Sequence, residues 1–71
     1  MNIRYFQDTD TLLLILTNHH VAETKDLSEN VLLDLDGDGN VVSLTIEHAS
    51  RQMAIDKFSY EQVRGTAAET A

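Results

Sequence analysis

The chain has 71 residues, with twelve acidic and five basic side chains, a net charge of −7 and no cysteine. Without cysteine it has no disulfide, no thiolate zinc site, no iron–sulfur ligation and no cysteine nucleophile. A domain this small usually needs a stabilising element beyond its own core, so we expect a partner chain, or a metal held by oxygen or imidazole ligands. Because the five basic residues are scattered singly, nucleic acid and anionic membranes are disfavoured as partners and a basic protein is favoured.

No segment has the length of a membrane span. The longest apolar run covers residues 12–16, whereas a bilayer requires about 20 residues. The N-terminus shows none of the regions of a secretion signal: no basic start, no apolar stretch and no cleavage site. We therefore expect a cytoplasmic protein, in which the negative charge at the least keeps a small domain soluble.

Two short apolar segments near the N-terminus predict a first β-hairpin. Residues 3–6 and 11–16 have strand character, and the polar residues between them have turn chemistry. Residues 17–20 close this hairpin. Residues 21–30 are mostly polar, and we expect them to form an extended segment or loop that carries the chain across the sheet.

A second β-hairpin is predicted over residues 31–46. Residues 31–35 alternate with Val31, Leu33 and Leu35 on one face, and residues 41–46 alternate in the same way. The connecting residues 36–40 contain two Asp-Gly steps, at Gly37 and Gly39, and glycine reaches the positive φ that tight hairpin turns demand.

The C-terminal third has a different character. Residues 49–55 contain good helix formers and predict a short helix. Residues 58–63 fit either a further strand or a continuation of the helix, and we favour the strand. We predict an α+β fold in which residues 1–64 form one domain: an antiparallel sheet of two β-hairpins (four strands, with residues 58–63 as a candidate fifth) and one short C-terminal helix. Residues 65–71 are expected to be a disordered tail.

The run Leu12-Leu13-Leu14-Ile15-Leu16 has a consequence for association. Successive residues of a strand point to opposite faces, so this strand places large aliphatic side chains on both sides of the sheet. One short helix can cover only one side. We expect a second copy of the chain, or a different protein, to cover the other; the alternative is that the C-terminal segment folds back over it.

In their order along the chain, these elements resemble a small prokaryotic family of domains of unknown function, number two-two-eight-three. The resemblance covers about residues 3–53 and implies a compact antiparallel α+β fold with no known activity; relatives that lie beside small toxin-like proteins imply a binding role. The resemblance is carried by the following residues, in order: Tyr5, Asp10 with residues 12–16, Val21-Ala22-Glu23-Thr24, residues 31–36 with Gly39, and Ile46-Glu47-His48-Ala49-Ser50.

The chain departs from this family pattern at three positions. Phe6 stands where an aspartate is usual, Ser43 where glycine is frequent, and His48 where a larger apolar residue is common. These departures put any role of the first turn in doubt.

The sharpest chemical hypothesis is a calcium site in residues 34–40. Asp34, Asp36 and Asp38 occupy the first, third and fifth positions of a calcium-loop pattern, and Gly39 the sixth. The twelfth position is Thr45 in place of the bidentate glutamate, and the flanks are strands where the pattern requires helices. An ordinary hairpin turn is therefore favoured, and Asp34, Asp36 and Asp38 remain low-ranking metal candidates.

Zinc is a weaker hypothesis. Its candidate ligands are His19, His20 and His48, with Glu23 as a fourth. Adjacent His19 and His20 on an extended chain point to opposite sides, so they do not chelate one ion, and exposed loop histidines are the simpler interpretation.

Two groupings of polar residues invite a catalytic interpretation. Glu47, His48 and Ser50 are the only local set with the residue types of a hydrolytic triad, yet Ser50 or Glu47 more readily satisfies the free amides of a first helical turn. Asp8 and Asp10 lie in a turn, where aspartate commonly bonds its own backbone, and nothing apolar nearby would raise a pKa. We predict no catalytic or cofactor-binding residue and no cofactor.

The leading hypothesis is a non-enzymatic protein-interaction module that forms a homodimer or higher oligomer. Its acidic surface would engage a protein partner, such as a small basic toxin-like ribonuclease that it neutralises. The alternative is a calcium- or metal-responsive regulator using Asp34, Asp36 and Asp38, and an enzyme ranks third.

Overall fold

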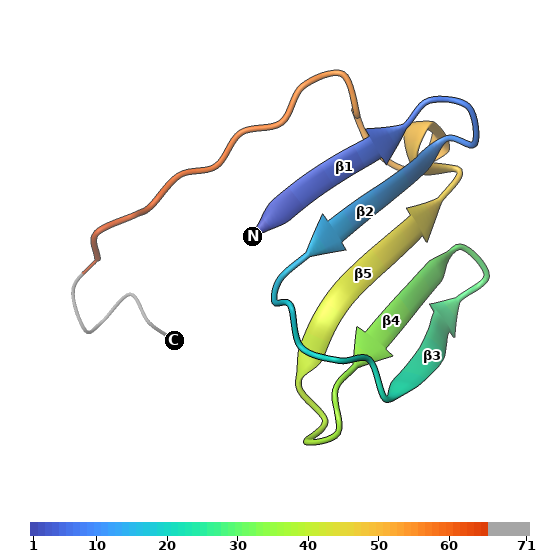
Figure 1. The fold of residues 1–71 in the computed structure, drawn as a ribbon. Helices are drawn as coiled ribbons and strands as arrows, with labels where there is room; N and C mark the ends of the chain where they lie inside the picture. Colours follow the sequence, from blue (N-terminus) through green and yellow to red (C-terminus); the bar gives the residue numbers. More distant parts are fainter. Residues whose placement is uncertain (66–71) are drawn as a thin grey trace.

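Five β-strands and one turn of 3-10 helix make up the regular structure of residues 1–65 (Figure 1). The structure is a computed structural model, and it describes residues 1–65. The strands are β1 (Asn2–Phe6), β2 (Thr11–Ile15), β3 (Glu23–Ser28), β4 (Val31–Leu35) and β5 (Val41–Glu47), and the 3-10 turn is η1 (Ala49–Arg51).

The strands form one antiparallel sheet in the order β1-β2-β5-β4-β3. β1 pairs with β2, and β4 with β5, over the segments in which the sequence predicts hairpins. The last strand, β5, lies in the middle and joins these two pairs by bonding to β2. The two sheet edges are consequently β1 and β3.

β3 was not predicted as a strand, because residues 21–30 were expected to form an extended segment or loop. Every residue of β3 is exposed. Its sequence therefore lacks the alternation of apolar and polar residues by which a half-buried strand is recognised. Its backbone pairs with β4 from Glu23 opposite Leu35 to Ser28 opposite Val31, with a bulge between Asp26 and Ser28. An edge strand of this kind is held mainly by its ladder of hydrogen bonds and contributes little apolar burial.

The predicted α+β class is wrong, because no helix forms over residues 49–55. The helical structure is limited to η1, in which the Arg51 amide donates to the His48 carbonyl at 3.0 Å and the Gln52 amide to the Ala49 carbonyl at 3.0 Å. An isolated helix much shorter than about 12 residues is marginal without packing along its length. Only Ala49 of η1 is buried, so nothing extends the turn into a helix. Within residues 1–65 the fold is nearly all β.

The remainder of the chain leaves the sheet as an irregular extended segment. Residues 58–63 form neither the favoured strand nor a helix. We call residues 57–65 the C-terminal arm; it runs past β1 and away from the sheet (Figure 1). The expected disordered tail lies, apart from residue 65, outside the described residues.

The β4–β5 turn explains why one of its two glycines is required. Gly39 has φ of 85°, whereas Gly37 does not adopt a positive φ. The turn is closed by the Gly39 amide, which donates to the Asp36 carbonyl at 3.1 Å, and by the Asp36 amide, which donates to the Asn40 carbonyl at 2.9 Å. The prediction of positive φ therefore holds for Gly39 alone.

This difference gives a test with a built-in control. Gly39→Ala places a Cβ in the left-handed region and should lower the free energy of unfolding by about 1–2 kcal/mol. Gly37→Ala meets no atom within 4 Å and should change stability by less than about 0.5 kcal/mol. Urea unfolding followed by circular dichroism measures both, and equal losses for the two variants would contradict this account of the turn.

Candidate interaction surface

One face of the sheet is apolar. Cross-strand partners point to the same side, so Leu14 lies with Ile3 on β1 and Leu44 on β5, and Leu44 lies with Leu33 on β4. We call this side the apolar face; its strand residues are Ile3, Tyr5, Leu12, Leu14, Val31, Leu33, Leu35, Val42, Leu44 and Ile46.

The chain covers one end of this face itself. Ala49 of η1 is fully buried. Met53, Ile55 and Phe58, which follow η1, line a small hollow together with Ile3, Tyr5 and Leu12 from β1 and β2. Residues 53–58 therefore lie on the same face as η1 and reach only its β1–β2 end; within residues 1–65 the C-terminal segment does not fold back over the opposite face, which was the alternative expected from the sequence.

Away from this end, residues 1–65 cover the apolar face only in part. In the described part of the chain, the buried apolar side chains are Leu35, Val42, Ile46 and Ala49, and no large side chain is fully buried. Leu14, Leu33 and Leu44 are partly exposed in the interior of the sheet. These side chains of the interior strands thus expose apolar surface that a domain normally buries.

The opposite face is mixed, and polar bonds organise its centre. Asp34 of β4 accepts from the Thr24 hydroxyl and from the Ser43 hydroxyl, each at 2.6 Å. These two bonds, that from Ser43 first, lower the pKa of Asp34 below its ordinary value. Arg4 lies over the Phe6 ring, 5.2 Å from its centroid. We call this the polar face; besides its charged and hydroxyl groups it carries Leu13, Ile15 and Leu32, which are partly exposed.

The three aspartates of the calcium hypothesis are not arranged around a common point. Asp34 is engaged with Thr24 and Ser43 on the polar face. In the turn, Asp36 Oδ1 accepts from the Asp38 and Asn40 amides, each at 2.9 Å. Within residues 1–65 no three His, Cys, Asp or Glu side chains lie close enough together to hold a metal ion. In this structure the two carboxylates that begin the motif serve the sheet and the turn.

The histidines also take separate structural partners. His19 Nδ1 lies 2.9 Å from Asp36 Oδ2, and His48 Nδ1 lies 2.9 Å from Asn30 Oδ1. His20 is exposed, and Glu23 lies on β3 opposite Leu35. The bond from His19, followed by those from the turn amides, lowers the pKa of Asp36. No local pattern signals either histidine pair, because the partners are 17 and 18 residues apart.

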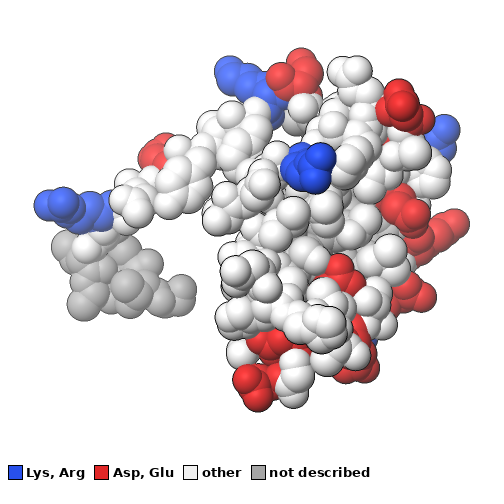
Figure 2. All heavy atoms as spheres, viewed as in Figure 1, with Lys and Arg blue, Asp and Glu red and all other residues white. Residues whose placement is uncertain are grey.

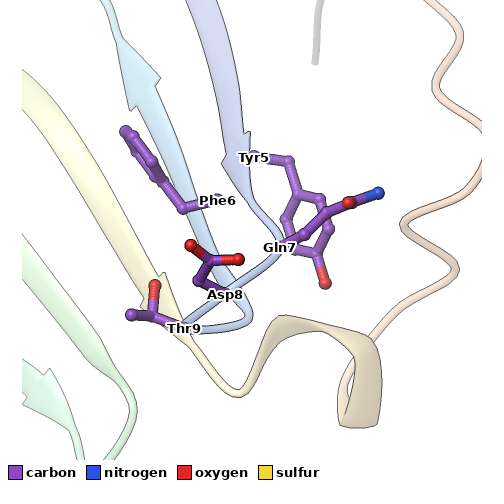
Figure 3. Close-up of a pocket in the computed structure, with 5 residues that line it drawn as sticks. All are labelled: Tyr5, Phe6, Gln7, Asp8 and Thr9. Carbon is purple, nitrogen blue, oxygen red and sulfur yellow. The ribbon is translucent and has the colours of Figure 1, made fainter.

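Asp10 links the first hairpin to the end of β5, which the sequence analysis did not foresee. Its carboxylate accepts from the Tyr5 hydroxyl at 2.6 Å, the Ser50 hydroxyl at 2.7 Å and the Ser50 amide at 3.0 Å. Its backbone carbonyl accepts from the Ala49 amide at 2.9 Å. Figure 3 shows Tyr5 directed toward the side of the hairpin on which η1 lies, with Phe6 on the other side. We call this set of contacts the Asp10 latch.

The latch also decides between two interpretations of Ser50. Its hydroxyl donates to Asp10, and His48 bonds Asn30, so in this structure Glu47, His48 and Ser50 do not form a relay. Ser50 or Glu47 was expected to satisfy the free amides of a first helical turn; instead the Ser50 amide itself donates to the Asp10 carboxylate. The hydrogen bonds from Tyr5 and then Ser50 lower the pKa of Asp10.

Charge is divided unevenly over the sheet. Residues 23–47 contain seven acidic side chains and one basic side chain, whereas the arm contains two basic and one acidic. Figure 2 shows the acidic groups gathered over the β3–β4 side and around the β4–β5 turn, with basic groups toward β1 and along the arm. The molecule therefore has an acidic side and a weakly basic projection.

Comparison with known families agrees with the resemblance seen in the sequence. A family model described as "Protein of unknown function (DUF2283)" matches residues 2–50. The chain belongs to this family. No significant match was found among curated proteins or among solved structures.

The matched region of the DUF2283 family coincides with the sheet. It contains all five strands and ends at Ser50, the residue that the Asp10 latch holds. The arm lies beyond it. No helix among the described residues has the length and apolarity to span a bilayer.

The latch predicts a specific dependence on pH. Because the pKa of Asp10 is lowered on folding, its contribution is present above about pH 4 and is lost as the pH falls through the folded-state pKa. Asp10→Asn keeps a residue that tolerates φ of 54° but removes the charge. We expect a lower melting temperature than wild type at pH 7, and a difference that shrinks toward pH 2.

Asp8→Asn is the matched control, since Asp8 is an exposed carboxylate of the same turn. Thermal melts of the three proteins between pH 2 and pH 7 make the comparison. An Asp10→Asn deficit of constant size over this range would show that the ionised carboxylate has no special role.

Calcium should not stabilise the protein, because Asp34 and Asp36 already have hydrogen-bond partners. We expect the melting temperature to agree within error in calcium at millimolar concentration and in chelator. A calcium-dependent increase that disappears in Asp38→Asn would restore the metal hypothesis.

Proposed function

We propose that this DUF2283 domain is a non-enzymatic protein-interaction module that self-associates through its apolar face. The observation that carries the proposal is the partial exposure of Leu14, Leu33 and Leu44 in the interior of a single-layer sheet. Interior strands are where a domain of this size normally concentrates its buried side chains. A partner on this face would bury the side chains that the chain itself leaves partly exposed.

The energetics favour such an association. Burial of about 600 Å² of apolar area contributes about 15 kcal/mol, at roughly 25 cal/mol per Å². Lost translational and rotational freedom opposes it by about 4–15 kcal/mol. The remainder is about 0–11 kcal/mol, and the upper part of this range reaches the roughly 8 kcal/mol of a micromolar dimer. The polar face supports the same orientation, because Asp34, Thr24 and Ser43 satisfy one another there without a partner.

A charge placed on each face in turn tests the proposal. Leu44→Lys introduces an ammonium on the apolar face of β5, and Thr45→Lys places the same group one residue later on the polar face. Sedimentation equilibrium between 1 and 100 μM should give an oligomer for wild type and Thr45→Lys, and a monomer for Leu44→Lys.

Leu33→Ser is a second variant, for the case that Leu44→Lys fails to fold. It removes apolar area from the same face without inserting a charge, and circular dichroism reports whether the sheet persists. A wild-type protein that is monomeric at 100 μM and unfolds cooperatively would refute the proposal.

A further inference from the structure

The C-terminal arm carries apolar side chains that rest on little of their own chain. Phe58, Tyr60 and Val63 are exposed to 63%, 67% and 75% of their surfaces. Phe58 and Tyr60 border Met1 and Ile3 at the start of β1. Beyond this contact the arm projects outward from the β1 edge (Figure 1). Side chains of this kind are typical of a segment that packs against another surface.

The arm points away from the part of its own sheet that lacks cover. It leaves over β1, whereas the uncovered half of the apolar face includes Leu44 of β5 and Leu33 of β4, on the far side of β2. To reach them within one chain, the arm would have to reverse its direction. Nine extended residues span about 30 Å, and a five-stranded sheet is about 20 Å wide. The arm is therefore long enough to cross a neighbouring sheet.

Charge complementarity also matches the arm to the far half of the sheet. The arm carries Lys57 and Arg64 against one acid, Glu61. The pairing register divides the strand acids of the β3–β4 side between the two faces: Asp26 and Asp34 lie on the polar face, whereas Glu23 lies with Lys25 on the apolar face. At the β3 border of the apolar face of one copy, Glu23 is thus the acidic counterpart for a basic side chain of another copy's arm.

We propose that the arm of one copy lies across the β5–β4–β3 half of the apolar face of a second copy, and that the exchange is reciprocal. The inference rests on the proposed function, because it names what occupies the face. Each copy supplies one arm and one open surface, so a two-fold axis satisfies both and closes the assembly as a dimer. The arm's own first residues show the same packing in cis, where Phe58 lies against Ile3 and Leu12.

The absence of cysteine from the chain allows a clean cross-linking test. Val63→Cys is mixed with isotopically labelled Lys25→Cys under mild oxidation, and the disulfide-linked product is weighed. We expect a mixed dimer, since Lys25 lies on the apolar face at β3. Asp26→Cys is the control, because the next residue of β3 points to the polar face; it should link to Val63→Cys far less.

Substitution of the arm tests its contribution to affinity. Tyr60→Ser with Val63→Ser in the full chain should raise the dimer dissociation constant at least about 30-fold. Phe6→Ser removes an exposed aromatic from the polar face and should leave the dissociation constant unchanged.

Lys57→Glu with Arg64→Glu should also weaken the dimer, and this loss of affinity should diminish as the salt concentration is raised. Arg4→Glu, on the polar face, is the control for this pair.

The outcomes separate this inference from the proposed function. A dimer that is insensitive to the arm substitutions but lost in Leu44→Lys overturns arm exchange and leaves self-association standing. A wild-type monomer overturns both. In a chain that carries Val63→Cys and Lys25→Cys together, a disulfide that forms within the chain, and not between chains, shows that the arm folds back in cis and overturns the exchange. A complex that forms only with an added basic protein overturns it as well.

Discussion

A sheet one layer thick has two faces, and this chain can cover only part of one of them. Ala49 and the residues after η1 close the β1–β2 end of the apolar face. Leu14, Leu33 and Leu44 remain partly exposed where an ordinary domain has its densest packing. The scarcity of buried side chains within residues 1–65 is a consequence of this incomplete cover.

The sheet is nevertheless well determined, because polar contacts fix its ends and its centre. The Asp10 latch joins the first turn of the chain to the last, across 40 residues. Asp34 ties β3, β4 and β5 together through two hydroxyls, and Asp36 organises the β4–β5 turn through backbone amides and His19. Asp10, Asp34 and Asp36 thus have structural roles that need no metal and no substrate.

The sequence predicts this fold where apolar residues alternate or run together along a strand, and fails where they do not. β4 and β5 follow from alternation, and the run at residues 12–16 divides as expected, with Leu12 and Leu14 on one face and Leu13 and Ile15 on the other. β3 carries no such pattern, because all its side chains are exposed. The helix over residues 49–55 follows from propensity alone, and propensity without packing stops at η1. Asp10, Tyr5 and Ser50 are visible in the family resemblance, but their convergence is a property of the strand order.

The two edges of the sheet explain why association is expected through a face. β3 presents Glu23, Lys25 and Asp26 and is interrupted by a bulge, and charges and bulges are the usual means by which an edge strand resists pairing with another strand. At the opposite edge, Phe58 and Tyr60 of the arm lie beside the start of β1. Growth of the sheet by strand addition is therefore impeded at both sides. The apolar face is then the large surface left for a partner, and a closed dimer on that face would not propagate as strand addition at an open edge does.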